Sequence, residues 1–276
     1  MSYRVHWMNT GEIEVSLGVS LLGLGYNPKM PGGQILTYGY QERIERADGT
    51  IGAGTMVPIP FYYIEGTEQK IIIDTGTNAE TCSEGEVLTE AYGGRQYWYT
   101  TPEQDARAQL SRHGVTPEEI DIVIMTHLHL DHIGNTKLFP NARFIVQREE
   151  LAWFMAPPIA SAFYYPELRH YFADIMDQVD CIEGDMQVET GLELALVGGH
   201  TPGSMVVLIE TANGKVGLVG DFYYNYINME YDWTPGAYWD LGQWLRNSRR
   251  IKQMADIVIP NHDYRYMELY PNGVIE

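Results

Sequence analysis

The chain has few cysteines and no long apolar run among its 276 residues. Its two cysteines, Cys82 and Cys181, lie far apart and outside any metal-ligand spacing, so we expect buried or incidental thiols. No stretch approaches the roughly 18 uninterrupted apolar residues of a membrane span. The amino terminus also lacks a positively charged segment followed by an apolar run. The sequence therefore predicts a soluble, cytoplasmic protein without a membrane partner.

Basic side chains are also scarce: 18 Lys and Arg stand against 37 Asp and Glu, which leaves a formal charge of −19 at pH 7. A phosphate backbone would be repelled by such a field unless a local basic stripe overcame it. The tightest basic cluster consists of Arg246, Arg249, Arg250 and Lys252, and it is typical of the solvated face of a helix. The sequence thus argues against nucleic acid as a partner.

The composition that remains is that of an ordinary globular protein, with 45 % hydrophobic residues. No low-complexity linker divides the chain, and its length lies within the range of single layered α/β domains. We therefore expect residues 1–276 to form one domain.

Strand and helix signals organise the first half of the chain. Met56–Glu65 and Lys70–Asp74 have the composition of strands, and the residues between them predict a hairpin. A helix is expected to begin near Thr101, because Thr101 can cap it and Gln104 completes a capping box. Gly114 is expected to end this helix.

Four short apolar runs each lead to a histidine or an aspartate. They are Asp121–Ile124 with His127, Leu194–Val197 with His200, Val216–Val219 with Asp221, and Asp256–Ile259 with His262. Such runs suit strands covered on both faces, and ligand sites collect at strand ends. The first and last runs are the same tetrapeptide with the histidine at the same offset. This repeat indicates two similar β-rich halves that meet at one site.

The densest group of potential ligands is an H-x-H-x-D-H run that contains His127, His129, Asp131 and His132. Residues two apart on an extended backbone point the same way, so His127 and His129 can bind one ion together. The chain must then turn for Asp131 and His132 to reach a second ion. Neutral imidazole suits zinc, and carboxylate adds a hard, charge-neutralising ligand. A lone histidine is more often structural, but this density favours a metal site.

Three further residues bring the potential ligands to seven: His200, Asp221 and His262. His200 lies in a Gly-Gly-His-Thr-Pro-Gly loop, and Asp221 follows a glycine at a strand end. The remaining histidines have no comparable context and are interpreted as structural: His6, His113 and His170.

In their order, these motifs resemble the metallo-β-lactamase superfamily. The resemblance covers about residues 50–265 and includes Asp74, which lies in an Ile-Asp-Thr-Gly segment similar to the strand-end D-x-G element of that superfamily. It implies an α/β fold, the αββα sandwich, in which two β-sheets face each other, helices cover the outside and the metals lie at one edge.

The resemblance further implies two metal ions per chain, with zinc favoured and other divalent transition metals open. The first ion would be held by His127, His129 and His200. The second would be held by Asp131, His132 and His262, with Asp221 bridging both. Asp74 would support the ligands, or it would simply form a turn; both interpretations stay open.

Within the superfamily, the chain looks most like the N-acyl-homoserine lactone lactonases. Those enzymes carry a tyrosine three residues after the bridging aspartate, and Tyr224 occupies that place in an aromatic loop. Their loop after the third histidine often continues as H-x-P-G-H, whereas here it ends in Ser204. This difference weakens the assignment to the lactonases but does not affect the predicted metal ligands.

The implied activity is that of a dinuclear-metal hydrolase that opens the ester bond of a small lactone, foremost an N-acyl-homoserine lactone, as in quorum quenching. A hydroxide bridging the metals would attack the carbonyl, and Tyr224 would donate a hydrogen bond to the developing oxyanion. Asp131 would carry a proton to the leaving alkoxide.

Several alternatives remain open, among them another lactone, an ester or a thioester as substrate, and a non-enzymatic metal-binding or sensing module. Class B β-lactamases normally lack an aspartate at the bridging position, and flavin-linked diiron enzymes usually carry a carboxylate in place of His129. Glyoxalase-type thioesterases add a carboxyl-terminal helical region that we do not expect here. Nucleases fit poorly with the negative charge. The aromatic stretches Leu151–Tyr165 and Tyr223–Trp239 are candidate pocket walls, although core packing explains most such residues.

Overall fold

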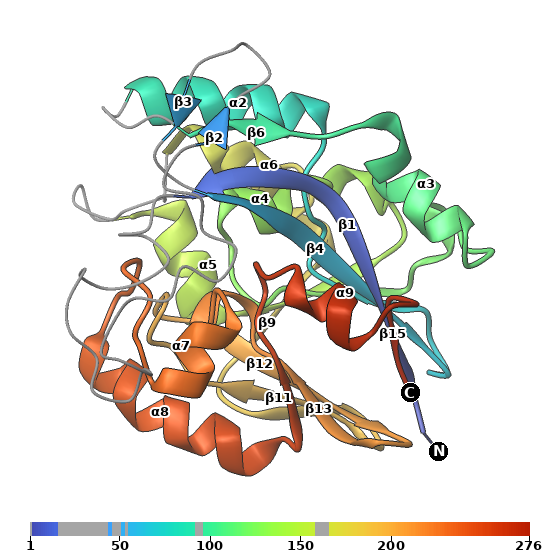
Figure 1. The fold of residues 1–276 in the computed structure, drawn as a ribbon. Coiled ribbons are helices and arrows are strands. Elements are labelled where there is room, and N and C mark those ends of the chain that lie inside the picture. Colours follow the sequence, from blue (N-terminus) through green and yellow to red (C-terminus); the bar gives the residue numbers. More distant parts are fainter. Residues whose placement is uncertain (1, 16–43, 46–50, 53–54, 92–95, 158–165) are drawn as a thin grey trace.

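Two β-sheets form the centre of the protein (Figure 1). The computed structural model describes residues 2–15, 44–45, 51–52, 55–91, 96–157 and 166–276. The first sheet has the strand order β15-β1-β4-β5-β7-β8-β9, and β6 pairs with β1 at its side. The second sheet has the order β10-β11-β12-β13-β14, and β2 and β3 form a small separate pair.

The strands of the first sheet are β1 (Arg4–Val15), β4 (Thr55–Glu65), β5 (Ile71–Ile73), β6 (Trp98–Tyr99), β7 (Ile122–Ile124), β8 (Arg143–Gln147), β9 (Val179–Ile182) and β15 (Val274–Ile275). Those of the second sheet are β10 (Met186–Glu189), β11 (Leu192–Leu196), β12 (Met205–Thr211), β13 (Gly214–Leu218) and β14 (Ile257–Ile259). The small pair consists of β2 (Ile44–Glu45) and β3 (Ile51–Gly52).

Helices cover the outer faces of the two sheets (Figure 1). The α-helices are α2 (Ala79–Ala91), α3 (Ala106–Ser111), α4 (Leu130–Ile133), α5 (Arg148–Met155), α6 (His170–Ala173), α7 (Tyr226–Tyr231), α8 (Leu241–Met254) and α9 (Arg265–Leu269). Short 3₁₀ turns are η2 (Pro102–Gln104), η3 (Pro117–Glu119), η4 (Thr136–Leu138), η5 (Pro166–Arg169), η6 (Met176–Gln178) and η7 (Gly220–Phe222). No helix in the described ranges is long and apolar enough to cross a membrane.

Three apolar cores follow from the alternation of side chains along the strands. In β5, Ile72 packs beneath the helices of the first layer, whereas Ile71 and Ile73 pack between the sheets. In β12, Val207 packs between the sheets while Val206 and Leu208 pack under α8. Because successive strand residues point to opposite faces, such strands are apolar throughout and each sheet is buried on both sides. The layers are therefore helix, sheet, sheet, helix, and the predicted αββα sandwich is confirmed.

The apolar runs identified in the sequence all form strands. The two Asp-Ile-Val-Ile copies contain β7 of the first sheet and β14 of the second, as expected for two halves that meet. The predicted hairpin is the antiparallel pair β4–β5. Cys82 is buried, Cys181 is half-buried, and both are free thiols.

The prediction that an α-helix begins near Thr101 is wrong about the residue at which the helix begins. Thr101 and Gln104 do form a capping box, but they cap the 3₁₀ turn η2. The α-helix α3 begins at Ala106, where the Asp105 side chain accepts a hydrogen bond from the backbone of Arg107. The chain therefore contains two start signals in succession, and the second one begins the α-helix.

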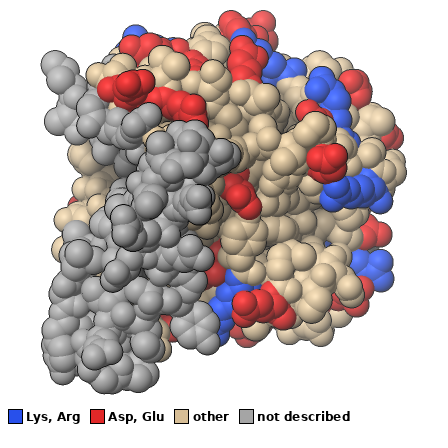
Figure 2. All heavy atoms as spheres, turned by 45° about the horizontal axis from the view of Figure 1, so that its top comes forward, with Lys and Arg blue, Asp and Glu red and all other residues tan. Residues whose placement is uncertain are grey.

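Acidic and basic side chains are interspersed on the face of the protein drawn in Figure 2. No continuous basic stripe crosses the described part of that face. Within the predicted basic cluster, Arg250 pairs with Asp185 and Lys252 with Asp232, so part of its charge is offset by neighbours.

Candidate metal centre

The seven predicted ligands follow strands that end at one edge of the sandwich. β11 and β13 are both antiparallel to β12, and β13 is parallel to β14, so these three strands point the same way. The loops after them carry His200, Asp221 and His262, and the loop after β7 of the facing sheet carries His127 and His129. All seven side chains are brought together in two clusters that share Asp221.

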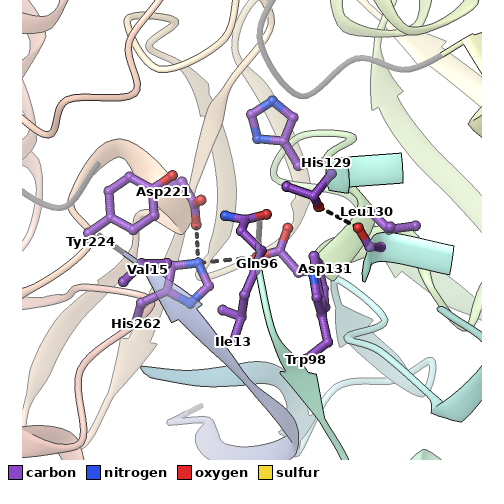
Figure 3. Close-up of a pocket in the computed structure, with 12 residues that line it drawn as sticks. Ile13, Val15, Gln96, Trp98, His129, Leu130, Asp131, Asp221, Tyr224 and His262 are labelled. Carbon is purple, nitrogen blue, oxygen red and sulfur yellow. Dashed lines mark hydrogen bonds and ion pairs between the residues drawn. The ribbon is translucent and has the colours of Figure 1, made fainter. Parts of the chain in front are cut away.

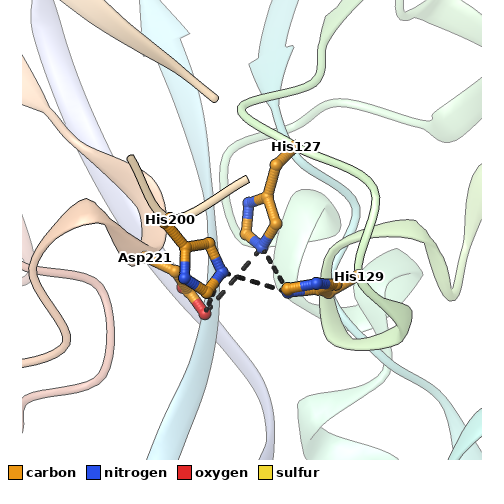
Figure 4. A group of neighbouring side chains, drawn as sticks. All are labelled: His127, His129, His200 and Asp221. Carbon is orange, nitrogen blue, oxygen red and sulfur yellow. Dashed lines mark hydrogen bonds and ion pairs between the residues drawn. The ribbon is translucent and has the colours of Figure 1, made fainter. Parts of the chain in front are cut away.

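The first cluster consists of His127, His129, His200 and Asp221, and all four are buried (Figure 4). Nδ1 of His129 lies 3.0 Å from Nε2 of His127 and 3.1 Å from Nε2 of His200. Oδ2 of Asp221 lies 3.6 Å from Nε2 of His200 and 3.8 Å from Nε2 of His127. Three ring nitrogens and one carboxylate oxygen thus converge on one point.

The second cluster consists of Asp131, His132, His262 and the other oxygen of Asp221. Oδ1 of Asp221 lies 3.0 Å from Nε2 of His262 and 3.2 Å from Nε2 of His132. Oδ2 of Asp131 lies 3.4 Å from Nε2 of His262 and 3.8 Å from Nε2 of His132. Asp221 therefore presents one oxygen to each cluster, which is the geometry required of a bridging ligand.

Outward-facing ring nitrogens are held by hydrogen bonds, which orients the inward-facing ones. Nδ1 of His200 bonds the carbonyl of Ala237 at 2.9 Å, and Nδ1 of His262 bonds the carbonyl of Pro58 at 2.7 Å. A carbonyl only accepts, so each Nδ1 is protonated and, in the neutral ring, each Nε2 presents a lone pair to its cluster. Metal-binding histidines in proteins are oriented in this way.

Asp74 contacts His132 of the second cluster directly and His127 of the first cluster through Thr126. Its Oδ2 accepts hydrogen bonds from Nδ1 of His132 and from the hydroxyl of Thr126, both at 2.7 Å, and its Oδ1 accepts from the Thr126 backbone. The Thr126 hydroxyl in turn lies 3.2 Å from Nδ1 of His127. Asp74 is fully buried and adopts a left-handed φ of 58°. These contacts favour the interpretation that Asp74 supports the metal ligands over the one in which it only forms a turn.

The pKa values differ between the two clusters. Burial lowers the pKa of His127 and His200, and it lowers that of His129 to about 3. Burial also opposes a charge on His262, but Asp221 and Asp131 outweigh it and raise the pKa of His262 to about 10. Without a metal, the neutral form is thus favoured for the histidines of the first cluster, whereas His262 is favoured in its protonated form beside the carboxylates Asp131 and Asp221.

Both clusters fit a metal ion in size and chemistry. Nitrogen ligands at 2.0–2.1 Å around a tetrahedral ion lie about 3.3 Å apart, close to the separations in the first cluster. In the second, Nε2 of His132 is buried and makes no hydrogen bond within the described part of the chain. Such an atom carries a desolvation cost that a ligand would remove. Imidazole and carboxylate are the donors that zinc and related dications bind.

Gly220 allows the two sheets to meet at this site. It adopts a left-handed φ of 51°, and a Cβ there would lie 2.7 Å from the Thr126 hydroxyl. Any side chain at this position would push Asp221 away from the histidines that follow β7.

Comparison with known proteins supports the same assignment. Residues 54–262 match the family described as the metallo-β-lactamase superfamily. The chain belongs to this superfamily. The N-acyl homoserine lactonase of Bacillus cereus is 30 % identical over 224 residues, which are 78 % of this chain and 86 % of that protein. The lactonase AttM of Azorhizobium caulinodans is 30 % identical over 229 residues, 77 % of this chain and 84 % of that protein.

Several solved structures have the same fold. The Bacillus thuringiensis AiiA structure with N-decanoyl-L-homoserine at its active site has a TM-score of 0.72 at 24 % identity and covers 98 % of this chain and 99 % of that one. A Staphylococcus aureus structure named a probable metal-dependent hydrolase has a TM-score of 0.75 at 22 % identity, with 95 % and 90 % covered. AidC, named a dizinc quorum-quenching lactonase, has a TM-score of 0.64 at 19 % identity, with 94 % and 87 % covered.

A pocket opens beside the two clusters of this superfamily member (Figure 3). Asp131, Asp221 and His262 line its polar side. The lining also contains the apolar residues Ile13, Val15, Trp98 and Leu130 and the polar residues Thr89 and Gln96. Figure 3 shows these side chains surrounding the space next to Asp131.

Tyr224 lines the pocket, whereas its tyrosine neighbours do not. Its ring stacks on His262 with centroids 5.2 Å apart and meets His200 edge-on at 5.8 Å. Tyr223 instead bonds Ser248 of α8 at 2.7 Å, and Tyr226 lies under Arg265. Among the described residues of the two aromatic stretches, Tyr224 is therefore the one that reaches the pocket. Residues 158–165 of the first stretch lie outside the described ranges.

Two other features singled out in the sequence can be placed in the structure. Ser204 closes the loop after His200 by accepting a hydrogen bond from the backbone of Thr201 at 3.0 Å. The histidines interpreted as structural lie outside both clusters: His6, His113 and His170.

Sequence reasoning missed several supporting residues. Trp98 lines the pocket, and Asn261 donates to Oδ1 of Asp221 at 3.1 Å. Glu150 is fully buried behind the first cluster. Glu150 follows β8 closely, so the strand-end rule that found the ligands would also have pointed to it.

Proposed function

We propose that this protein is a dinuclear metal-dependent lactonase that hydrolyses the ester bond of N-acyl-homoserine lactones. The observation that carries the proposal is the sharing of Asp221 by two His–Asp clusters beside a pocket lined in part by apolar residues. The named lactonase relatives, which align over more than three quarters of the chain, support the choice of substrate.

In this proposal, His127, His129 and His200 would hold one ion, expected to be zinc. Asp131, His132 and His262 would hold a second ion, and Asp221 would contribute to both. Two dications bound there would supply Lewis acidity to a carbonyl and would lower the pKa of bound water toward neutrality. The buried carboxylates Asp74, Asp131 and Asp221 offset much of their charge.

Two side chains of the site, Tyr224 and Asp131, take part in the remaining steps of the reaction. The Tyr224 hydroxyl donates a hydrogen bond to the lactone carbonyl oxygen, where negative charge develops as water adds to the carbon. Asp131 takes a proton from that water and passes it to the ring oxygen as the ester C–O bond breaks. The products are an open N-acyl-homoserine carboxylate and a proton.

The apolar lining residues suit the acyl chain of the substrate, and the indole N–H of Trp98 suits its amide group. Nε1 of Trp98 is buried and has no hydrogen-bond partner in the described ranges. An unsatisfied N–H costs roughly 1–3 kcal/mol, which a bound carbonyl would recover. A nearby amide oxygen of the substrate is the acceptor that we assign to it.

The experiment compares metal-free and zinc-loaded protein on a panel of lactones and esters. The proposal expects turnover only in the loaded protein, with N-acyl-homoserine lactones among the best substrates. Asp221→Asn should abolish this turnover, whereas His170→Gln, outside both clusters, should not. Zinc uptake without turnover of any member of the panel would instead favour a metal-binding or sensing module. Preference for a thioester or a plain ester would reassign the substrate.

A further inference from the structure

Glu150 is a buried carboxylate that lies behind the first cluster and is not one of its ligands. It belongs to the first turn of α5 and is 1 % exposed. Its Oε1 accepts a hydrogen bond from the backbone N–H of Leu128 at 2.9 Å. Its Oε2 accepts from the Thr201 hydroxyl at 2.7 Å and from the backbone N–H of Gly203 at 3.0 Å. Three donors directed at two oxygens form the pattern of an ionised carboxylate.

These donors lie next to the three histidines of the first cluster. Leu128 stands between His127 and His129, and Thr201 follows His200. The two loops come from different sheets, since one follows β7 and the other follows β11. One carboxylate thus connects the two segments that must be held in register for three ring nitrogens to converge.

The contact between α5 and the second loop is tight. A Cβ on Gly203 would lie 2.5 Å from the backbone nitrogen of Glu150, so only glycine allows this approach. Ser204 folds the same loop back by bonding Thr201. Among the described residues, the backbone N–H of Met205 also joins the two loops by bonding the carbonyl of Thr126 at 3.0 Å. Glu150 therefore adds three hydrogen bonds to the contacts that connect them.

We propose that Glu150 is a positioning residue that sets the metal affinity of the first cluster and leaves that of the second unchanged. The inference rests on the proposed function, because it assumes that both clusters bind ions. Its physical basis is that the ligands of the second cluster are oriented by other groups: His132 by Asp74, and His262 by the Pro58 carbonyl.

The selective perturbation is Glu150→Gln. Glutamine keeps one acceptor oxygen and replaces the other with an NH₂ group, which would face a donor and cannot accept from it. At least one loop therefore loses its attachment while the side chain keeps its size. Outer partners of metal ligands typically contribute 10- to 100-fold in affinity, so we expect a loss of about that size at the first cluster.

The matched control is Glu149→Gln, which makes the same change on the exposed neighbour in α5. Each variant is stripped of metal and titrated with zinc against a competing chelator. Crystals prepared at the free zinc concentration that just saturates wild type then give the occupancy of each cluster by anomalous scattering at the zinc edge. We expect full occupancy of both clusters in wild type and Glu149→Gln, and selective loss at the first cluster in Glu150→Gln.

Two ions bound with wild-type affinity in Glu150→Gln would overturn this inference and leave the proposed function intact. A wild-type protein that takes up no zinc would overturn both. Equal weakening of the two clusters would also contradict selective positioning. If Glu150→Gln does not fold, Thr201→Val replaces it, because it removes one of the three hydrogen bonds and keeps the carboxylate. It should weaken the first cluster by a smaller factor, and no weakening would overturn the inference.

Discussion

Replacement of Tyr224 by phenylalanine tests whether its hydroxyl takes part in the reaction. The ring is buried to 94 % and stacks on His262, so phenylalanine keeps these contacts and removes only the hydroxyl. Loss of one oxyanion donor raises the barrier by about 1.4–4 kcal/mol, a fall in kcat of roughly ten- to a thousandfold. Metal content should not change, since the hydroxyl is not among the proposed ligands.

The neighbouring tyrosines provide internal controls for this prediction. Tyr223→Phe removes the hydrogen bond to Ser248 under α8, so it should lower the free energy of unfolding by about 1 kcal/mol and leave kcat near wild type. Tyr226→Phe should be mild in both respects. The assay is steady-state lactone hydrolysis at equal zinc loading, with zinc content determined on each sample. Equal kcat for all three variants would refute the role of the Tyr224 hydroxyl.

The remaining predictions address the metal clusters and the substrate pocket. Asp74→Asn, which weakens the support of His132, should lower zinc affinity about 10- to 100-fold in a chelator competition. Trp98→Phe should lower kcat/KM for an N-acyl-homoserine lactone but not for an alkyl lactone without an amide; equal losses would contradict the proposed hydrogen bond. Because the pKa of His262 is raised to about 10, zinc loading at pH 8 should release protons, detectable as a buffer-dependent binding enthalpy. In the metal-free protein, the stability contributed by this group is complete below its unfolded-state pKa of about 6.5 and is lost as pH rises through 10, so Tm should fall over that range.

The layers and the ligands could be predicted because each rests on a local pattern. A run such as Asp121–Ile124 is apolar at every position, which indicates a strand buried on both faces, and β7 is such a strand. The H-x-H-x-D-H run concentrates ligands so strongly that no tertiary information was needed to suspect a metal site. The start of α3 was missed because Thr101 and Asp105 are both sound caps, and sequence alone does not rank them.

The groups that orient the ligands could not be predicted in the same way, because they come from segments that are distant in the sequence. His200 and His262 are oriented by the carbonyls of Ala237 and Pro58, and a backbone acceptor leaves no residue type to recognise. Glu150 joins loops that are more than fifty residues apart in the chain. The position of Glu150 after a strand marks it as a candidate, but the partners of all these groups can be identified only when the two sheets are placed face to face.

The most direct test of the account is a zinc titration of the metal-free protein in which bound ions and turnover of an N-acyl-homoserine lactone are measured on the same samples. The account predicts that activity reaches its maximum at about two ions per chain. It also predicts that Asp221→Asn, which alters the ligand shared by both clusters, neither holds two ions nor turns over the lactone. Full activity at one ion per chain, or undiminished activity in Asp221→Asn, would contradict the dinuclear mechanism.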